Sequence, residues 1–551
     1  MSNTLFRLLV CWMAISSAVA ADSSAEITKS PEFQRGRLLY VRHCLICHMG
    51  AGQGQPSTYP PLAGSDFLMA DTPRAIRALC EGLTGPITVN GVNYDNAMPA
   101  IVLDDQGVAD VLTFVRNSWG NVGGPVTADT IAPVRATTRF RTYDELVLAS
   151  NYPPLPKAPD GFIVREVARL NGYPVRLASD NRSGPLLALT QDGDVLSVDV
   201  ATAKTTTLIV GTSYADLSLG SPSTRGMTVG PDQHLYVTAN QQNTTGPQVM
   251  NETSVFRSVK PIDELPLQLS VWYRTNYPFG VGPYNHGISD IAFGPDGYVY
   301  VASGSRTDGG EKGNIPGYST EGETPITAGI WRIDPRTTPP TMEVYARGLR
   351  NVYGFDWDGT GELFSVSNGP DTHAPEEMDH VVRGGHYGFP YQFSNWTRKP
   401  YPHTPDLPAG IVVRPPLANY GLAAGGSAAA PLFTFDAHSS PAGMAWLDEN
   451  WPPGFQNCFV ITRFGNLLAL NQDVGFDVLL ARLTKNADGE YSVHTDTLLA
   501  PLGRPIDVHV YRGGIYIAEY TRPTDLKNGL GWLPGRIIEL KPKWTGQTTD
   551  R

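Results

Sequence analysis

The sequence predicts a multidomain protein in which an all-α N-terminal domain precedes an all-β, six-bladed β-propeller. Two observations carry this prediction. Helical periodicity is confined to residues 30–122, and hairpin-like repeats run from residue 186 to residue 520. The chain has 551 residues, 41% of them hydrophobic, which is enough length and apolar content for two buried cores.

The charge of the chain argues against one class of partner. Lysine and arginine number 42 against 53 aspartates and glutamates, which gives a net charge of −11. A nucleic-acid-binding protein needs a basic surface that displaces counterions from phosphates. The sequence contains no run of basic residues, so we expect no nucleic acid partner.

Residues 1–20 have the form of a secretory signal peptide. A basic start precedes a short apolar run, and Ala18-Val19-Ala20 offers small residues for cleavage after Ala20. This run is shorter than the roughly 20 apolar residues that cross a bilayer, and no later segment qualifies either. We therefore expect a protein that is exported to the periplasm and has no transmembrane segment.

The all-α domain, residues 30–122, is predicted from three helical stretches. Apolar residues recur at helical spacing in residues 33–48, 73–82 and 104–119, and Asp71 and Asp104 stand where acidic caps begin helices. Residues 123–155 are rich in glycine, threonine and proline, and they predict a linker to the second domain at residues 156–541.

Residues 44–48, Cys-Leu-Ile-Cys-His, form the C-x-x-C-H pattern that attaches haem c covalently. We expect Cys44 and Cys47 to form two thioether bonds, and His48 to bind the iron from one side. Cys80 and Cys458 lie in different regions and are expected to be buried apolar side chains without a disulfide.

A second iron ligand is expected downstream of His48. Met98 is the candidate, because it lies in a non-helical segment before the last helix. A methionine opposite a histidine favours the reduced iron and raises the reduction potential. Met69 is an alternative, whereas Met49 is adjacent to the histidine and cannot reach the opposite face of the haem.

The order of these motifs resembles that of class I c-type cytochromes. C-x-x-C-H is followed by Pro60-Pro61-Leu62, by Met98-Pro99 and by a helix that ends in residues 115–121. The resemblance covers residues 30–122 and is greatest to cytochromes attached to periplasmic dehydrogenases.

Six segments in the remainder share an apolar strand, a turn with glycine or aspartate, and a second alternating strand. They are residues 186–200, 226–240, 291–304, 355–369, 444–464 and 506–520. Six hairpins predict a six-bladed propeller, since a two-sheet sandwich is too small for about 390 residues.

Three stretches of the propeller carry candidate site residues. His286 precedes the third repeat, at the mouth of the expected channel, where a purely structural loop histidine is the alternative. Arg350 and Asn351 open the fourth repeat, and Gly369-Pro370 follows its second strand. Carbonyl- and carboxylate-rich loops such as residues 369–377 suit Ca²⁺, although a solvated acidic loop has the same composition.

These segments together resemble the soluble, PQQ-dependent glucose/sorbosone (aldose sugar) dehydrogenases. The matching motifs are His286-Gly287 with residues 293–297, Gly348-Leu349-Arg350-Asn351, Gly369-Pro370 with Glu376-Glu377, and residues 385–390. The resemblance covers about residues 156–541 and implies a six-bladed propeller that carries pyrroloquinoline quinone (PQQ) over its channel.

The resemblance implies a role for each matching residue. His286 would be the catalytic base, and Arg350 and Asn351 would hold PQQ and its reactive carbonyl region. The backbone oxygens of Gly369 and Pro370 would bind the Ca²⁺ that polarises PQQ. The remaining matches are Glu376, Glu377 and Tyr387 for a second, structural Ca²⁺, and Arg463 and Arg504 for the carboxylates of the quinone.

Three positions bear on the substrate. Asn285 stands where glucose-oxidising members have an acid, and Tyr353 replaces a polar amide, so the resemblance does not imply glucose itself. His438 is expected to line the mouth of the channel. The sequence thus predicts hydride transfer from a sugar, alcohol or aldehyde to PQQ, with electrons leaving through haem c to a cytochrome or the quinone pool.

Two other classes of protein combine a haem domain with a propeller. A nitrite reductase of cytochrome type would have eight blades and a second haem. A non-catalytic binding propeller would use its haem domain only to dock to a partner. No strand–G-x-G-x-x-G–helix unit occurs in the sequence, which argues against a nicotinamide cofactor.

Overall fold

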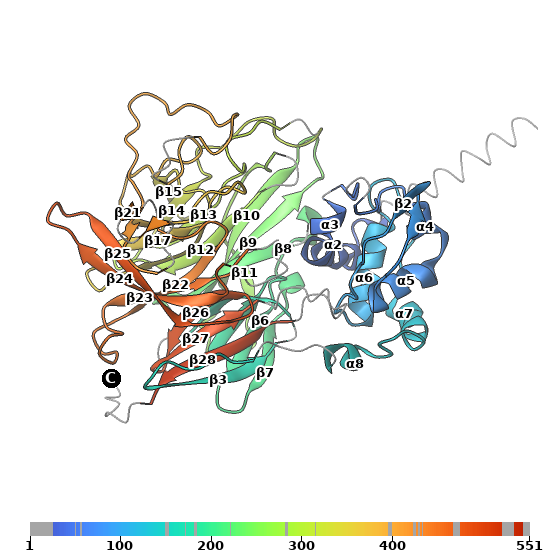
Figure 1. Ribbon diagram of the computed structural model, residues 1–551, viewed down its shortest axis with the longest axis horizontal. Coiled ribbons are helices and arrows are strands. Elements are labelled where there is room, and N and C mark those ends of the chain that lie inside the picture. Colours follow the sequence, from blue (N-terminus) through green and yellow to red (C-terminus); the bar gives the residue numbers. More distant parts are fainter. Residues whose placement is uncertain are drawn as a thin grey trace, which may run out of the picture. The chain divides into compact units, whose positions relative to one another are not determined.

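The computed structural model divides the chain into two compact units, Met1–Asn151 with Thr524–Leu533, and Tyr152–Pro523 with Pro534–Arg551 (Figure 1). It describes residues 26–49, 51–54, 58–148, 154–170, 172–180, 184–220, 222–281, 285–313, 316–394, 399–422, 426–427, 430–431, 434–466, 474–520 and 534–543. The predicted signal peptide lies outside these residues. Among the helices that the structure describes, none is long and apolar enough to span a membrane.

The first unit is helical, as predicted. Its elements are α2 (Pro31–His43), α3 (Leu45–His48), α4 (Asp66–Ala70), α5 (Thr72–Glu81), the hairpin β1 (Ile87–Val89) and β2 (Val92–Tyr94), α6 (Asp105–Val115), α7 (Ala128–Arg135) and α8 (Tyr143–Leu148). The two predicted caps are confirmed, because the side chains of Asp71 and Asp104 accept hydrogen bonds from the backbone of Arg74 and Gly107.

Helices α2 and α6 cross at a glycine. A Cβ atom on Gly36 would lie only 1.9 Å from the carbonyl oxygen of Asp110, so the two backbones approach too closely for any side chain. One residue earlier, Arg35 donates two hydrogen bonds to the carboxylate of Asp110, at 2.6 and 3.0 Å. The crossing holds the helix that ends at the C-x-x-C-H motif against the core of the unit.

The prediction that residues 123–155 form a linker is wrong for most of their length. Helices α7 and α8 lie in this segment, and α7 packs on α5 and α6. Ile131 is fully buried, and the buried Arg135 pairs with Asp105 at 2.5 Å and donates to the carbonyl of Leu103 at 2.8 Å. These contacts make the segment part of the helical unit.

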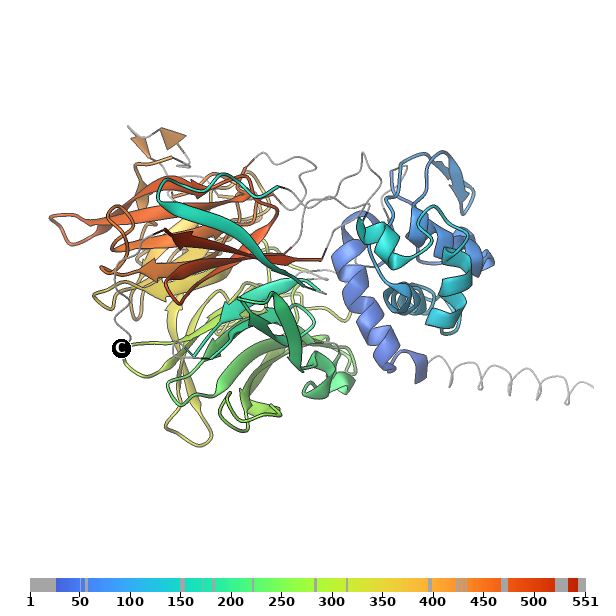
Figure 2. The same cartoon turned by 90° about the horizontal axis from the view of Figure 1, so that it is seen from below.

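The second unit is the predicted six-bladed propeller (Figures 1 and 2). Its six sheets are β4 (Pro174–Ala178), β5 (Leu186–Thr190), β6 (Val195–Asp199) and β7 (Lys204–Ile209); β8 (Pro222–Val229), β9 (Leu235–Asn243), β10 (Met250–Ser258) and β11 (Leu269–Pro278); β12 (Ile288–Phe293), β13 (Val299–Ser303), β14 (Gly329–Asp334) and β15 (Thr341–Arg347); β16 (Val352–Trp357), β17 (Leu363–Ser367) and β18 (Glu377–Val381); β22 (Pro441–Leu447), β23 (Cys458–Arg463), β24 (Asp477–Lys485) and β25 (Tyr491–Leu499) with β19 (Ala418–Asn419); and β26 (Pro505–Tyr511), β27 (Gly514–Glu519) and β28 (Arg536–Pro542) with β3 (Phe162–Arg169).

Two kinds of contact close the six sheets into a ring. The first strand of each sheet contacts the first strands of both neighbouring sheets, and β26 contacts β4. The sixth sheet takes its outer strand from the start of the unit, because β3 pairs antiparallel with β28. Six closed blades exclude the eight-bladed nitrite-reductase alternative.

A buried arginine joins the inner strands around the channel. Arg176 on β4 pairs with Asp507 on β26 at 2.9 Å and donates to the carbonyl of Tyr353 on β16 at 2.7 Å. It also donates to the carbonyl of Arg225 on β8 at 3.1 Å. These bonds fix the ring of strands whose starts carry the site residues.

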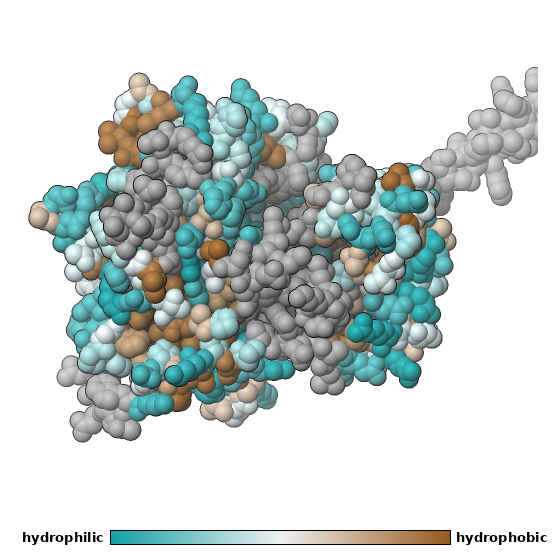
Figure 3. All heavy atoms as spheres, viewed as in Figure 1, coloured by the Kyte–Doolittle hydropathy of each residue, from teal (hydrophilic) through white to brown (hydrophobic). Residues whose placement is uncertain are grey.

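The surface carries both hydrophilic and hydrophobic side chains, and the two cysteines Cys80 and Cys458 outside the C-x-x-C-H motif are buried. On the face drawn in Figure 3, hydrophilic residues are interspersed with hydrophobic ones over both units. Cys80 and Cys458 are buried and free, as predicted.

Candidate functional site

The C-x-x-C-H motif opens onto a pocket in the helical unit whose walls are almost entirely apolar. Cys44, His48 and Met98 all line it, and its walls include Leu68, Leu79 and other apolar side chains. Cys47 is half-buried beside Tyr59. The structure thus brings together the sulfur and imidazole groups that the sequence assigns to haem, in a cavity suited to a large apolar ring.

The imidazole of His48 is held in one orientation. Its Nδ1 lies 2.9 Å from the carbonyl oxygen of Pro60, so Nδ1–H donates and the lone pair is on Nε2. A backbone partner of this kind fixes the tautomer of a metal-binding histidine. Burial lowers the pKa of His48, which keeps the ring neutral.

Met98 lines the pocket from a segment whose backbone pairs with Leu83 in an isolated β-bridge. Its N–H and carbonyl exchange hydrogen bonds of 2.9 Å with Leu83. Gly82 permits this approach, since it has a φ of +80° and a Cβ there would lie 2.5 Å from the carbonyl oxygen of Met98. The alternative Met69 packs against the core of the unit but is not among the residues that line the pocket.

The propeller residues gather at one end of the ring because of strand direction. His286, Arg350-Asn351 and Arg504 precede the inner strands β12, β16 and β26, whereas Gly369-Pro370 and Arg463 lie at the ends of second strands. In antiparallel sheets the start of one strand and the end of its neighbour share an edge.

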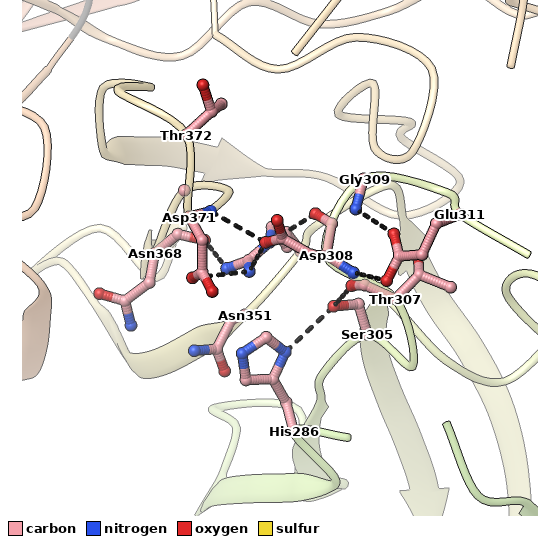
Figure 4. Close-up of polar contacts among 12 residues, drawn as sticks. His286, Ser305, Thr307, Asp308, Gly309, Glu311, Asn351, Asn368, Asp371 and Thr372 are labelled. Atoms are coloured by element: carbon pink, nitrogen blue, oxygen red, sulfur yellow. Dashed lines mark hydrogen bonds and ion pairs between the residues drawn. The ribbon is translucent and has the colours of Figure 1, made fainter. Parts of the chain in front are cut away.

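His286 is held through its ring and its backbone. Its Nδ1 lies 3.0 Å from Ser305 Oγ (Figure 4). Its backbone N–H donates to the carbonyl of Ser305 at 3.0 Å. Burial, with the positive charges of Arg350 and Arg225, holds the pKa of His286 well below 6.5. The ring is therefore neutral at physiological pH, as a general base must be.

Arg350 is buried beside this histidine and already engaged. Its guanidinium pairs with Asp308 Oδ1 at 2.5 Å and donates to the carbonyl of Asn368 at 3.0 Å, with Asp371 at 3.8 Å. Asn351 lies next to His286 in Figure 4.

Glu376 belongs to the same group. Its Oε2 accepts a hydrogen bond of 2.5 Å from the N–H of Gly369, and burial raises its pKa to about 7 while the charge of Arg350 lowers it. The structure therefore brings His286, Arg350, Asn351, Gly369 and Glu376 together.

Arg463 and Arg504 form a second group around Phe476. Arg463 binds Asp477 through two hydrogen bonds, at 2.8 and 2.6 Å. Its Nη1 is buried without a hydrogen-bond partner in the described residues, and the carboxylate of Asp436 lies 4.0 Å from it. The guanidinium of Arg504 lies 5.1 Å from the ring centre of Phe476 and donates to the carbonyl of Asn466 at 3.0 Å.

Glu377, one of the residues predicted for a structural Ca²⁺, lies close to a second carboxylate, that of Asp379. Glu377 and Asp379 are two residues apart in β18, so their side chains lie on the same face of the strand. Both residues are buried. Glu377 Oε2 and both carboxylate oxygens of Asp379 are buried without a hydrogen-bond partner among the described residues. Burial raises the pKa of both groups, and the charge of Asp379 raises that of Glu377 further.

The hydroxyl of Tyr387 is not free to join them. It donates to the carbonyl of His380 at 2.7 Å and accepts from the N–H of Val382 at 2.8 Å. No cluster of three or more His, Cys, Asp or Glu side chains is arranged for a metal within the described residues. Any ion between Glu377 and Asp379 would also need backbone or water oxygens.

Three residues singled out for the substrate lie in separate surroundings. The carbonyl of Tyr353 is bonded to Arg176 in the channel, and Asn285 lies beside the buried Tyr277. His438 has a φ of +65°, and its ring centre is 5.4 Å from that of His373. Backbone strain of this kind clusters at functional sites.

Sequence reasoning missed Ser305, Asp308 and Asp379. Ser305 and Asp308 follow the end of β13, so they are expected at the same edge of the ring as His286, which precedes β12. Asp379 is two residues from Glu377 in a strand, which places both side chains on one face.

These features define a class of protein, a helical domain with a C-x-x-C-H pocket joined to a six-bladed propeller with a half-buried histidine at one end of its ring. The cytochrome c family model matches residues 33–119, and the glucose/sorbosone dehydrogenase model matches residues 226–478. The chain belongs to the cytochrome c family through its helical unit, and its propeller carries the match to the glucose/sorbosone dehydrogenase model. The cytochrome c domain implies haem c.

The curated relatives match the helical unit. The cytochrome c subunit of a quinone alcohol dehydrogenase from Gluconobacter oxydans is 34% identical over 121 residues, which are 21% of this chain and 25% of that protein. Cytochrome c-552 of Thermus thermophilus is 36% identical over 111 residues, 18% of this chain and 84% of that protein. The chain spans only about a quarter of the length of the first of these relatives.

Solved structures resemble the propeller. The PQQ-bound aldose sugar dehydrogenase of Streptomyces coelicolor is 19% identical, with a TM-score of 0.45 over 70% of this chain and 99% of that chain. The apo aldose sugar dehydrogenase of Escherichia coli is 15% identical, with a TM-score of 0.46 over 69% and 100%.

Proposed function

We propose that the chain is a periplasmic quinohaemoprotein dehydrogenase that oxidises a sugar, or a related alcohol or aldehyde, and passes the electrons to its own haem c. One observation carries the proposal: a chain whose C-x-x-C-H motif and Met98 line one pocket also holds a half-buried histidine with a lowered pKa beside a buried arginine, at one end of a propeller. A predicted signal peptide supports export. The electrons would leave to a cytochrome or to the quinone pool.

The residues at the propeller site fit PQQ, which carries several carboxylates. Arg463 Nη1 is a buried donor without a hydrogen-bond partner in the described part of the chain, and a cofactor carboxylate would satisfy it. Arg350, Asn351 and Arg504 would complete the binding set. Carbonyl oxygens of Gly369 and Pro370 would bind the Ca²⁺ of the cofactor.

In this mechanism His286 takes the hydroxyl proton of the substrate on a ring nitrogen. Its low pKa, caused by burial and by the charges of Arg350 and Arg225, leaves the lone pair available. When bound, PQQ supplies the carbon that accepts the hydride. Arg350 is kept in place by Asp308, so that a positive charge faces the reacting groups without rearrangement.

The test is reduction of an artificial dye by the purified full chain. Chelator-treated protein is expected to be inactive and to recover only with both PQQ and Ca²⁺, while the absorption spectrum shows haem c. Activity with a nicotinamide cofactor alone would overturn the proposal. A haem spectrum without dye reduction under any condition would favour the non-catalytic binding propeller.

We propose a structural Ca²⁺ on Glu377 and Asp379, and Asp379→Asn is expected to remove its effect. Two buried carboxylates with unsatisfied oxygens on one strand face are stabilised by a divalent cation. Saturating Ca²⁺ should raise the melting temperature of the chelator-treated propeller by about 3–6 °C, as expected for a ligand that binds only the folded state. Differential scanning calorimetry measures it.

The matched control is Asp488→Asn, at an exposed turn between β24 and β25, which should keep the full shift. An equal shift in Asp379→Asn would assign the stabilising ion elsewhere, such as Gly369-Pro370. No shift in the unaltered chain would mean that the pair is held as protonated acids.

Met98→Ala is expected to retain covalent haem but to lower its reduction potential, because a thioether ligand favours the reduced iron. The weak sulfur-to-iron band at the red edge of the spectrum should disappear. Redox titration and absorption spectroscopy measure both effects, with Met69→Ala as the matched control. A lost band in Met69→Ala and a retained one in Met98→Ala would exchange the two assignments.

A further inference from the structure

Ser305 lies where it controls the proton of His286. Ser305 is fully buried, and its Oγ is 3.0 Å from Nδ1 of the imidazole. That distance alone is compatible with either direction of the hydrogen bond, because a neutral imidazole has one donor and one acceptor nitrogen. The direction follows from the other bond that the hydroxyl makes.

The Ser305 hydroxyl has a single proton, and it donates that proton to the carbonyl of Thr307 at 2.8 Å. A carbonyl oxygen only accepts, so this bond cannot be reversed. Ser305 Oγ must then accept from His286, which places a proton on Nδ1 and the lone pair on Nε2. Figure 4 shows the two bonds in sequence, from the ring to Ser305 and from Ser305 to Thr307.

The segment that carries the Thr307 carbonyl is held in place by Glu323. The carboxylate of Glu323 accepts from the backbone N–H of Arg306 at 3.0 Å, from that of Thr307 at 2.9 Å, and from the Thr307 hydroxyl at 2.6 Å. The N–H of Ser305 donates to the carbonyl of Arg350 at 2.8 Å. The orienting hydroxyl is therefore fixed from both sides, independently of substrate.

We propose, on the basis of the proposed function, that Ser305 is the positioning residue of the reaction and fixes the Nδ1–H tautomer of His286, so that Nε2 accepts the substrate proton. Serine differs from a carboxylate in this role because it is neutral. The charges that act on the ring are those of the cations Arg350 and Arg225, and Arg350 is paired with Asp308. A neutral partner stabilises the imidazolium formed at Nε2 less than a carboxylate would.

The first test is the tautomer itself, measured without activity. Selective ¹⁵N-histidine labelling of the full chain gives signals for its 11 histidines, and the spectrum of His286→Gln assigns the signal of interest. We expect a protonated Nδ1 and an unprotonated Nε2 in the unaltered chain, and a mixture of tautomers in Ser305→Ala. An unchanged tautomer in Ser305→Ala overturns the proposal, whether or not the chain proves to be a dehydrogenase.

The second test is kinetic. Ser305→Ala should lower kcat by about 10–100-fold with little change in the KM of the substrate, a loss typical of removing an orienting partner. Ser305→Thr keeps the hydroxyl and should recover most of the rate. In Ser305→Asp the fall of kcat/KM at low pH should occur at a higher pH than in the unaltered chain, because an anion stabilises the imidazolium. Equal rates in the alanine and threonine variants, or a fall at an unchanged pH in the aspartate variant, would reduce Ser305 to a packing residue.

Discussion

Replacing both Cys44 and Cys47 by serine is expected to abolish covalent haem attachment and leave the propeller folded. A hydroxyl does not replace the thiol that forms the thioether bond, so haem bound in the pocket would be lost on denaturation. The propeller should be unaffected, since the buried clusters formed by its described residues contain no residue of the helical unit. Haem staining after denaturing electrophoresis, with calorimetry of the propeller transition, measures both effects.

The matched control is a chain with Cys80→Ser and Cys458→Ser, the other two free cysteines of the described residues. It should keep all of its haem, at a cost of about 1–3 kcal/mol for each buried hydroxyl that lacks a partner. Haem that stays attached to the Cys44/Cys47 variant through denaturation would contradict the assignment.

Local signals predicted helix starts correctly and the linker wrongly. Asp71 and Asp104 cap helices through bonds to residues three positions away, and such short-range chemistry is visible in the sequence. Helix α7 contains Pro133 and follows a Gly-Pro stretch, which favours a linker locally. It is stabilised by Arg135 and Ile131 against distant parts of the unit, and no local pattern reports those contacts.

The six sequence repeats predicted the number of blades correctly, but the first repeat does not begin at the first strand of its blade. Five of the six segments are the first and second strands of a blade, whereas residues 186–200 are the second and third, β5 and β6. The inner strand β4 is buried at all five positions. A strand buried on both faces has no alternation, so the period-two pattern that identified the other blades is missing there.

The residues of the candidate site also fall into those that a local sequence motif predicts and those that it does not. His286 and Arg350 stand in recognisable motifs, but their partners are 19 and 42 residues away in the chain, at Ser305 and Asp308. The β12–β13 hairpin brings Ser305 to His286, and the packing of β13 against β16 of the next blade brings Asp308 to Arg350. The partners of Tyr387 are close to it in the sequence instead, because its hydroxyl bonds to the backbone of His380 and Val382.

The wild-type rate at low pH should reveal the environment of His286 before any substitution is made. Burial and two neighbouring cations hold the pKa of this ring well below 6.5, so protonation removes the base only at a pH below that value. The kcat/KM of the PQQ-loaded chain is therefore expected to stay level from pH 8 down past pH 6.5 and to fall only in more acidic buffer. A fall centred near 6.5 would mean a solvated imidazole.

His286→Ala is expected to lower substrate oxidation by about 10²–10⁴-fold, the usual loss when a general base is removed. PQQ should still bind, because the arginines that match its carboxylates are unchanged, and a chemical reductant should still reduce the haem. Steady-state dye reduction, titration of apo protein with PQQ and haem spectra separate these steps. His494→Ala, at an exposed position on β25, is the matched control and should keep the full rate. If His286→Ala retains the rate while His438→Ala loses it, the base lies at the strained residue 438 and His286 only orders the mouth of the channel.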